Sequence, residues 1–151
     1  WDALFETADI VSLHLPLTEQ TLHCVGQKEF DRMKPSALFI NTARGKLVDQ
    51  AALIQAVRRK AIAGAGIDVA QREEPIPPDD PLMEIAGWDN VIVTPHSAGW
   101  THEALQRETD LTIDNMILAL QGKLPSFVVN QDAVAGWRSK VKKRTSEENE
   151  E

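Results

Sequence analysis

The chain has 151 residues, of which 42% are hydrophobic and 26% charged, a composition typical of one soluble globular domain with its own core. Its net charge of −7 argues against general binding to nucleic acids or membrane surfaces, because both favour a basic face. No apolar run approaches the roughly 20 residues needed to cross a bilayer. A single cysteine, Cys24, excludes an internal disulfide and fits a reducing compartment, so we expect a cytoplasmic protein.

Helical and extended patterns alternate along the first hundred residues. Apolar and β-branched runs predict strands, and periodic patterns predict helices between them, one of which Asp49 caps. In chain order we expect a helix over 1–8, a strand over 9–15, a helix over 26–33, a strand over 37–40, a helix over 49–60, a strand over 62–69, a proline-rich loop over 70–90 with one turn at 82–85, and a strand over 91–94. This alternation predicts an α/β fold with a parallel sheet, whose apolar strands are expected to be buried on both faces.

The last third of the chain reads differently. Thr101 predicts the start of a long helix that runs to about Gln121 and is closed by Gly122. Residues 127–129 suit either a terminal strand or a docking segment, and the charged sequence after Asn130 predicts a frayed tail. We therefore divide the chain into residues 1–100, 101–129 and 130–151.

Two strand ends carry side chains that are well suited to chemistry at the carboxyl edge of the sheet, where ligands bind in such folds. Arg44 follows one strand, and its planar fork suits a substrate carboxylate, although a surface arginine at a strand end would look the same. His96 follows another strand and Pro95, and it can exchange a proton near neutral pH. A histidine that merely caps a turn is the alternative.

Carboxylates follow the strand that lies, in sequence, between the strands preceding Arg44 and His96. Glu73 or Glu74 could hydrogen-bond to His96, orient its ring and raise its pKa, or could simply belong to an exposed acidic loop. Asp68 could bind a polar ligand group or cap the following turn. The remaining histidines and Cys24 show no ligand spacing, so we predict no metal site.

Together these motifs resemble one family. Asn41-Thr42-Ala43-Arg44-Gly45, Gly66-Ile67-Asp68-Val69 with a following Glu-Pro, and Thr94-Pro95-His96-Ser97-Ala98-Gly99 are similar to the NAD-binding domain of the D-isomer-specific 2-hydroxyacid dehydrogenases. His14-Leu15-Pro16-Leu17-Thr18 and Leu47-Val48-Asp49 also match, and the resemblance runs from about residue 1 to 130. It implies a Rossmann-like parallel sheet with flanking helices. It also implies an oxidoreductase that transfers a hydride between NAD(P)H, with NAD favoured over NADP, and a small 2-oxo or D-2-hydroxy acid.

The resemblance also implies roles for individual residues. Arg44 would bind the substrate carboxylate and carbonyl, and His96 would act as acid or base, paired with a glutamate. The family places that glutamate five positions after the aspartate and directly before proline; here Glu73 satisfies the first condition and Glu74 the second, and we favour Glu74. The implied cofactor-binding residues are Leu15, Thr42, Ala43, Arg44, Asp68, His96, Ser97, Ala98 and Gly99.

One departure from the family is large. The sequence has no Gly-x-Gly-x-x-Gly turn to hold a pyrophosphate, and no acidic residue beyond one to bind the ribose. We therefore expect the C-terminal half of a dinucleotide-binding domain, with little turnover on its own. An exposed sheet edge would favour a homo-oligomer, most simply a dimer. The alternatives are a non-catalytic NAD(H)-sensing module of the same fold and an inactive fragment.

Overall fold

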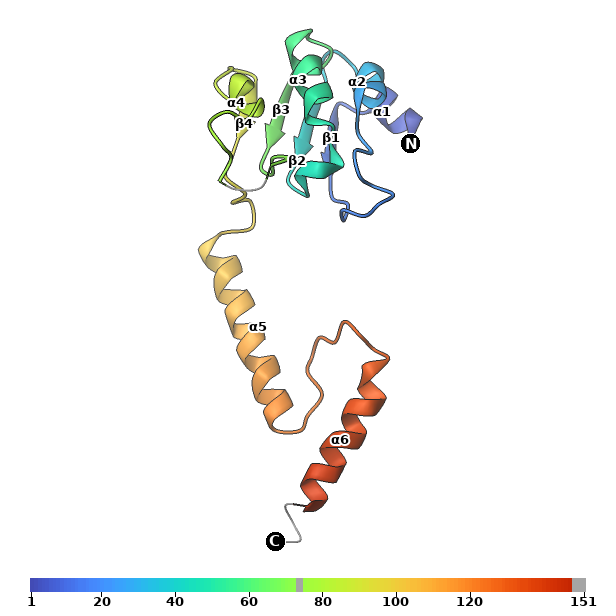
Figure 1. Cartoon of the computed structure of the whole chain (residues 1–151), viewed down its shortest axis with the longest axis vertical. Helices are drawn as coiled ribbons and strands as arrows, with labels where there is room; N and C mark the ends of the chain where they lie inside the picture. The colour runs from blue at the N-terminus through green and yellow to red at the C-terminus, as the bar shows by residue number, and fades with distance from the viewer. Residues whose placement is uncertain (73–74, 148–151) are drawn as a thin grey trace. The chain divides into compact units, whose positions relative to one another are not determined.

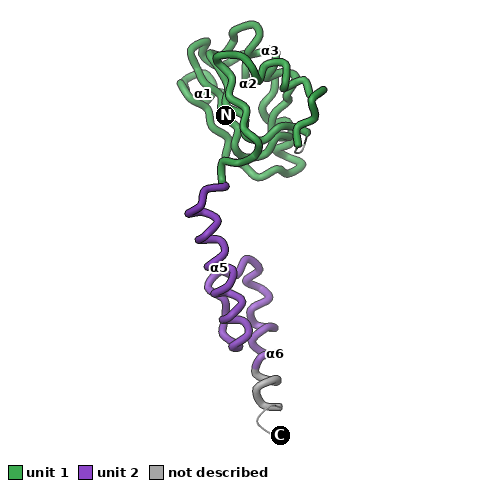
Figure 2. The backbone as a smooth tube through the Cα atoms, turned by 90° about the vertical axis from the view of Figure 1, so that its left-hand side faces the viewer, with its two compact units in different colours: residues 1–99 green, residues 100–151 purple. Residues whose placement is uncertain are grey.

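The computed structural model describes residues 1–72 and 75–147, of which 142–147 are described by their backbone alone. The chain forms two compact units, residues 1–99 and 100–151, which Figure 2 shows in different colours. All of the predicted site residues fall in the first unit, either within its described part or at positions 73 and 74.

A four-stranded parallel sheet forms the centre of the first unit, as the alternation predicts (Figure 1). The strands are β1 (Ile10–Leu13), β2 (Leu38–Asn41), β3 (Gly64–Ile67) and β4 (Val91–Val93), and they lie in the order β1-β2-β3-β4. Their last residues are in register, because Leu13 pairs with Asn41, Asn41 with Ile67, and Ile67 with Val93. The loops that follow these strands therefore leave one common edge.

Four of the described helices, one before β1 and three between successive strands, cover one face of the sheet. They are α1 (Asp2–Thr7), α2 (Gln27–Arg32), α3 (Gln50–Arg58) and α4 (Leu82–Ile85), with a single 3₁₀ turn at Gly45–Leu47. Each helix packs against the next, α1 on α2, α2 on α3 and α3 on α4. Right-handed crossovers that always advance in one direction place their helices on the same face, which accounts for this layer. The core lies beneath it, with Phe30 and Phe39 in edge-to-face contact at 5.1 Å between ring centres.

The opposite face of the sheet differs from the prediction that the strands are buried on both faces. In β1, Val11 and Leu13 are buried whereas Ile10 is 62% exposed. Leu38 of β2 is 41% exposed and Ile92 of β4 is 68% exposed. The physical reason is the topology: the four strands follow one another in sequence order, so their crossovers supply only one layer of helices. The first unit therefore carries an apolar sheet face.

The second unit is helical. α5 (His102–Leu120) begins as predicted, since the Thr101 hydroxyl accepts a hydrogen bond from the backbone N–H of Ala104 at 3.1 Å, and it ends before Gly122, which has φ of +69°. Residues 127–129 form no strand. The expected frayed tail is wrong, because α6 spans Ala133–Glu147. Alanine, arginine, lysine and glutamate in this segment have high intrinsic helix propensity, which needs no apolar stripe.

Among the residues that the structure describes, no helix is both long enough and apolar enough to span a membrane.

Candidate active site

Asn41 fixes the turn that carries Arg44. It is the last residue of β2 and its side chain is buried. Its Oδ1 accepts a hydrogen bond from the backbone N–H of Ala43 at 3.1 Å, and its Nδ2 donates to the backbone carbonyl of Arg44 at 3.0 Å. One buried amide therefore satisfies two backbone groups of the turn, and Arg44 leaves the sheet in a fixed position.

Gly45 brings this turn against the loop that follows β3. A Cβ atom at Gly45 would lie 1.8 Å from the carbonyl oxygen of Ala70 and 2.6 Å from the backbone nitrogen of Gln71. No side chain can occupy that space, so glycine is required for the close approach of the two backbones. The Arg44 turn and residues 70–71 consequently pack directly on each other.

Asp68 organises the loop that carries His96. It directly follows β3, and its side chain lies in the interior, with the residue only 4% exposed. Its Oδ1 accepts hydrogen bonds from the Thr94 hydroxyl and, at 2.9 Å, from the backbone N–H of Ser97; its Oδ2 accepts one from the N–H of Ala98 at 3.1 Å. This hold on the loop after β4 differs from both uses predicted for Asp68, which were to bind a ligand group or to cap the turn that follows it.

The surroundings of Asp68 favour the ionised form of its carboxyl group. Burial alone would raise the pKa of its carboxyl, but the hydrogen bonds from Thr94, Ala98 and Ser97, together with the nearby His96, outweigh burial and leave the pKa below its ordinary value. Asp68 is therefore a carboxylate throughout the neutral range, and it stays a pure acceptor for the donors of the loop.

His96 has a left-handed backbone conformation, with φ of +49°. Such a conformation is uncommon for a residue with a side chain and is retained where surrounding contacts enforce it. Here its N–H donates to the carbonyl of Asp68 at 2.8 Å and approaches that of Thr94 at 3.1 Å. The imidazole is thus placed at the sheet edge by a strained and hydrogen-bonded backbone, and it remains exposed.

Arg44 and His96 line one pocket of about 360 Å³. The strand ends therefore bring the predicted cation and imidazole together, as their position along the sheet suggests. The other residues of the pocket are not among the predicted site residues, although Leu17, Gly45 and Val69 belong to the motifs quoted above and the rest lie next to those motifs in sequence. They are Leu17, Gly45, Lys46, Val69, Ala70, Gln71 and Arg72.

A second pocket of about 470 Å³ shares Arg44 and Leu17 with the first. It is lined by two of the predicted cofactor-binding residues, Leu15 and Ala43, together with His14 and Pro16. The other predicted cofactor residues, Thr42, Ser97, Ala98 and Gly99, lie exposed on their loops.

Two further predictions concern carboxylates and metals. Glu73 and Glu74 lie outside the described residues. Within the described ranges, no group of three or more histidine, cysteine, aspartate or glutamate side chains is arranged to hold a metal ion.

The comparison with known families decides what this arrangement belongs to. Residues 1–98 match the family model described as "D-isomer specific 2-hydroxyacid dehydrogenase, NAD binding domain". The chain belongs to the D-isomer specific 2-hydroxyacid dehydrogenase family. The matched region contains the whole sheet and both pockets, so the sheet edge described above is part of a dehydrogenase NAD-binding domain.

Relatives and solved structures agree with this family. A glyoxylate reductase of Korarchaeum cryptofilum is 46% identical over 133 residues, which cover 88% of this chain and 39% of that protein. The crystal structure of D-lactate dehydrogenase with NAD⁺ from Lactobacillus jensenii superimposes with a TM-score of 0.79 at 37% identity, covering 87% of this chain and 42% of that one. An acyclic imino acid reductase, Bsp5, solved with NADPH and D-Arg, gives a TM-score of 0.72 at 32% identity. The match covers 85% of this chain and 39% of that one. The chain thus spans about two fifths of the length of these dehydrogenases.

Proposed function

We propose that the protein acts as an NAD-dependent 2-hydroxyacid dehydrogenase, with Arg44 and His96 as its catalytic residues. The observation that carries the proposal is their shared pocket, in which each side chain stands on a loop fixed by a buried polar residue, Asn41 for Arg44 and Asp68 for His96. Two groups held in this way can act on one small substrate without first being ordered.

The chemistry follows from the two side chains. The guanidinium of Arg44 binds the carboxylate of a 2-oxo acid and polarises the adjacent carbonyl. The imidazolium of His96 donates its proton to the carbonyl oxygen during reduction, and the neutral ring accepts it back during oxidation. Glu74, or Glu73 in its place, pairs with His96 and favours the protonated ring. A bound nicotinamide cofactor supplies the hydride.

The residues present fit the nicotinamide end of that cofactor. A Cβ built at Gly99 would meet nothing within 4 Å, so the backbone there is open to a flat ring. Leu15 and Ala43 offer an apolar wall next to Arg44. We propose that these residues hold the nicotinamide together with Thr42, Ser97 and Ala98, and that NAD is preferred to NADP. Asp68 contributes by holding Ser97 and Ala98 in place.

The test is the oxidation of NADH with glyoxylate or hydroxypyruvate, followed by absorbance. In the whole protein that contains this sequence, Arg44→Ala and His96→Ala should each reduce kcat/KM by about 10²- to 10⁴-fold. Arg58→Ala, which changes an exposed arginine of α3 that pairs with Glu84, is the matched control. Undiminished turnover in both site variants would contradict the proposal, and NAD(H) binding without turnover in the wild type would favour a sensing module instead.

The length of the chain suggests a further expectation. Because it spans about 39% of its relative, we propose that the 151-residue chain alone has little turnover. NADH oxidation at a normal rate by the purified chain would contradict this.

We also propose that the protein works in the cytoplasm as a homodimer. β1 lies at an edge of the described sheet, beside β2, and Ile10 and Ile92 are exposed on the open face. Unpaired strand edges and apolar faces favour association with another chain. Light scattering tests this, and a monomer at micromolar concentration would contradict it.

A further inference from the structure

The pocket that contains His96 carries more positive charge than a single carboxylate needs. Arg44, Lys46 and Arg72 all line it, and the described lining residues include no aspartate or glutamate. One arginine binds one carboxylate in a bidentate manner. A 2-oxo acid with only one carboxylate, such as glyoxylate, would therefore offer no anionic group of its own to Lys46 or Arg72.

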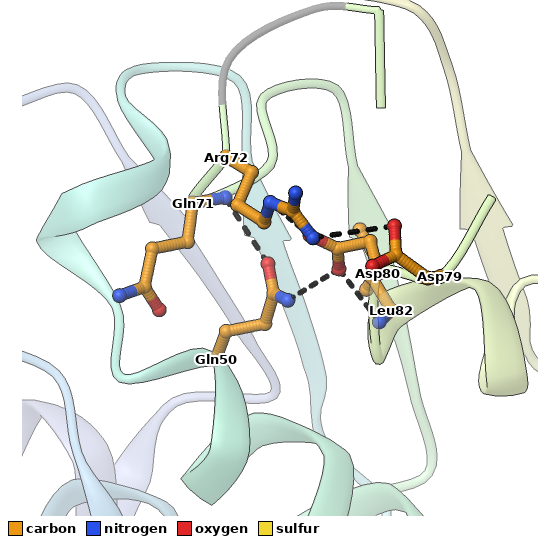
Figure 3. Close-up of polar contacts among 6 residues, drawn as sticks. All are labelled: Gln50, Gln71, Arg72, Asp79, Asp80 and Leu82. Atoms are coloured by element: carbon orange, nitrogen blue, oxygen red, sulfur yellow. Dashed lines mark hydrogen bonds and ion pairs between the residues drawn. The ribbon is translucent and has the colours of Figure 1, made fainter. Parts of the chain in front are cut away.

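A buried carboxylate holds Arg72 at this pocket (Figure 3). The side chain of Asp80 is 0% exposed, and its Oδ2 has no hydrogen-bond partner within the described part of the chain. The Nε atom of Arg72 lies 4.0 Å from that oxygen. Because a buried carboxylate is unfavourable unless a cation lies near it, Asp80 attracts the guanidinium and restricts where it can go.

Gln50 fixes Asp80 and the pocket wall at the same time. It is the first residue of α3, and its Nε2 donates to Oδ1 of Asp80 at 2.7 Å while its Oε1 accepts from the backbone N–H of Gln71 at 3.1 Å. The N–H of Leu82 donates to the same Asp80 oxygen at 2.9 Å. One amide therefore ties the segment before Arg72 and the segment after it to the same helix, as Figure 3 shows.

The outward side of Arg72 is available to a ligand. Its Nη1 lies 3.4 Å from the carboxylate of Asp79, whose side chain is 79% exposed, and this is its one ion pair among the described residues. Contacts between exposed charges are weak and easily exchanged. An anion in the pocket can replace Asp79 while Asp80 continues to hold the Nε side.

We propose that Arg72 is a specificity-determining residue that binds a second anionic group of the substrate, and that Asp80 and Gln50 are its positioning residues. The pocket then selects 2-oxo acids whose far end carries a carboxylate or a phosphate-like group. This inference rests on the proposed function of the same pocket, in which Arg44 takes the first carboxylate.

The test compares substrates that differ only in charge. Oxaloacetate carries a carboxylate where 2-oxobutyrate carries a methyl group, and 3-phosphonopyruvate carries a phosphonate. In the whole protein, kcat/KM should favour the doubly anionic acids by about tenfold, and Arg72→Gln should abolish the preference through KM while leaving 2-oxobutyrate within about twofold. The better of the two dianions identifies the group that the pocket takes.

Conservative and control variants separate charge from folding. Arg72→Lys should keep part of the preference, and Arg58→Gln should keep all of it. Asp80→Asn should lower the preference less than Arg72→Gln does, with folding checked by circular dichroism. A wild type without preference, or an Arg72→Gln variant that retains it, would overturn the inference.

Calorimetric binding of oxaloacetate and 2-oxobutyrate distinguishes this inference from the proposed function. If no 2-oxo acid is turned over but the wild type binds the dianion more tightly and Arg72→Gln does not, the dehydrogenase proposal fails and the role of Arg72 stands. If turnover occurs without any charge preference, the dehydrogenase proposal stands and the role of Arg72 in specificity fails.

Discussion

Replacing Asp68 with asparagine removes the charge that holds the His96 loop while keeping the shape of the side chain. The carboxylate accepts hydrogen bonds from the Thr94 hydroxyl, from the N–H of Ser97 and from the N–H of Ala98. An asparagine amide has only one accepting oxygen, so at least one of these donors would face an NH₂ group.

The size of the effect can be estimated from these bonds. Losing one hydrogen bond to a charged acceptor costs about 1.5–3 kcal/mol, and weakening the others from charged to neutral adds to this loss. Because the Asp68 carboxylate is buried, water replaces little of what is lost. We expect Asp68→Asn to lower the free energy of unfolding by about 3 kcal/mol at pH 7, and to lower kcat because His96 is no longer fixed.

The pH dependence gives a sharper test. The pKa of the Asp68 carboxyl is lower in the folded protein than its ordinary value of about 3.9. Its stabilisation is therefore fully present above that value and is lost as the pH falls through the folded pKa. Urea unfolding should show a constant difference between wild type and Asp68→Asn above about pH 5 and a shrinking difference below about pH 4.

Asp9→Asn is the matched control, because the Asp9 side chain is exposed and pairs with the exposed Lys34 at 2.9 Å, while the backbone carbonyl that binds Leu38 is unchanged by the substitution. We expect it to change stability by less than about 1 kcal/mol. The reasoning would be refuted if Asp68→Asn were as stable as the wild type at pH 7, or if the difference in stability were the same at pH 7 and pH 3.

Three other substitutions test the packing around the site by denaturant unfolding. Gly45→Ala should destabilise the protein by about 3 kcal/mol or more, because its Cβ would overlap the Ala70 carbonyl at 1.8 Å. Gly26→Ala is the control: its Cβ would lie 3.9 Å from the nearest atom, so it should cost less than about 1 kcal/mol. Equal losses of stability in the two variants would contradict the overlap. Asn41→Ala should lower the free energy of unfolding by about 2–3 kcal/mol, because it leaves backbone groups of Ala43 and Arg44 unpaired. It should also raise KM for the 2-oxo acid. An unchanged KM would argue against the role of Asn41 in positioning Arg44. Phe39→Ala should cost about 3–5 kcal/mol through the cavity beside Phe30, and a loss below about 1 kcal/mol would show that the core collapses around it.

The sheet and its site edge could be predicted because the signals are local. Each strand is an apolar run, and Arg44 and His96 come shortly after two of them. Parallel strands in register place their following loops at one edge whatever lies elsewhere. The helix caps at Asp49 and Thr101 are local too, and both are confirmed.

What the sequence did not reveal depends on contacts between distant residues. Gln50 reads as an ordinary first helical residue, and only folding brings it to Asp80, thirty positions further along. The close approach of Gly45 to Ala70 likewise cannot be predicted from the sequence, because the two residues are far apart along the chain. The open sheet face was missed for a different reason: an apolar run of four residues has the same composition whether one or two of its sides are covered.

The contact between Gly45 and Ala70 has a consequence for engineering this protein. Two loops that touch through bare backbone cannot be exchanged independently, because any change in the path of one displaces the other. Loop grafting aimed at new substrates should therefore leave the backbone at 45 and 70–71 untouched and vary only the side chains that face the pocket, such as those of Leu17 and Arg72. Sequence libraries built in this way would vary the lining of the pocket while keeping Arg44 at the edge of the sheet.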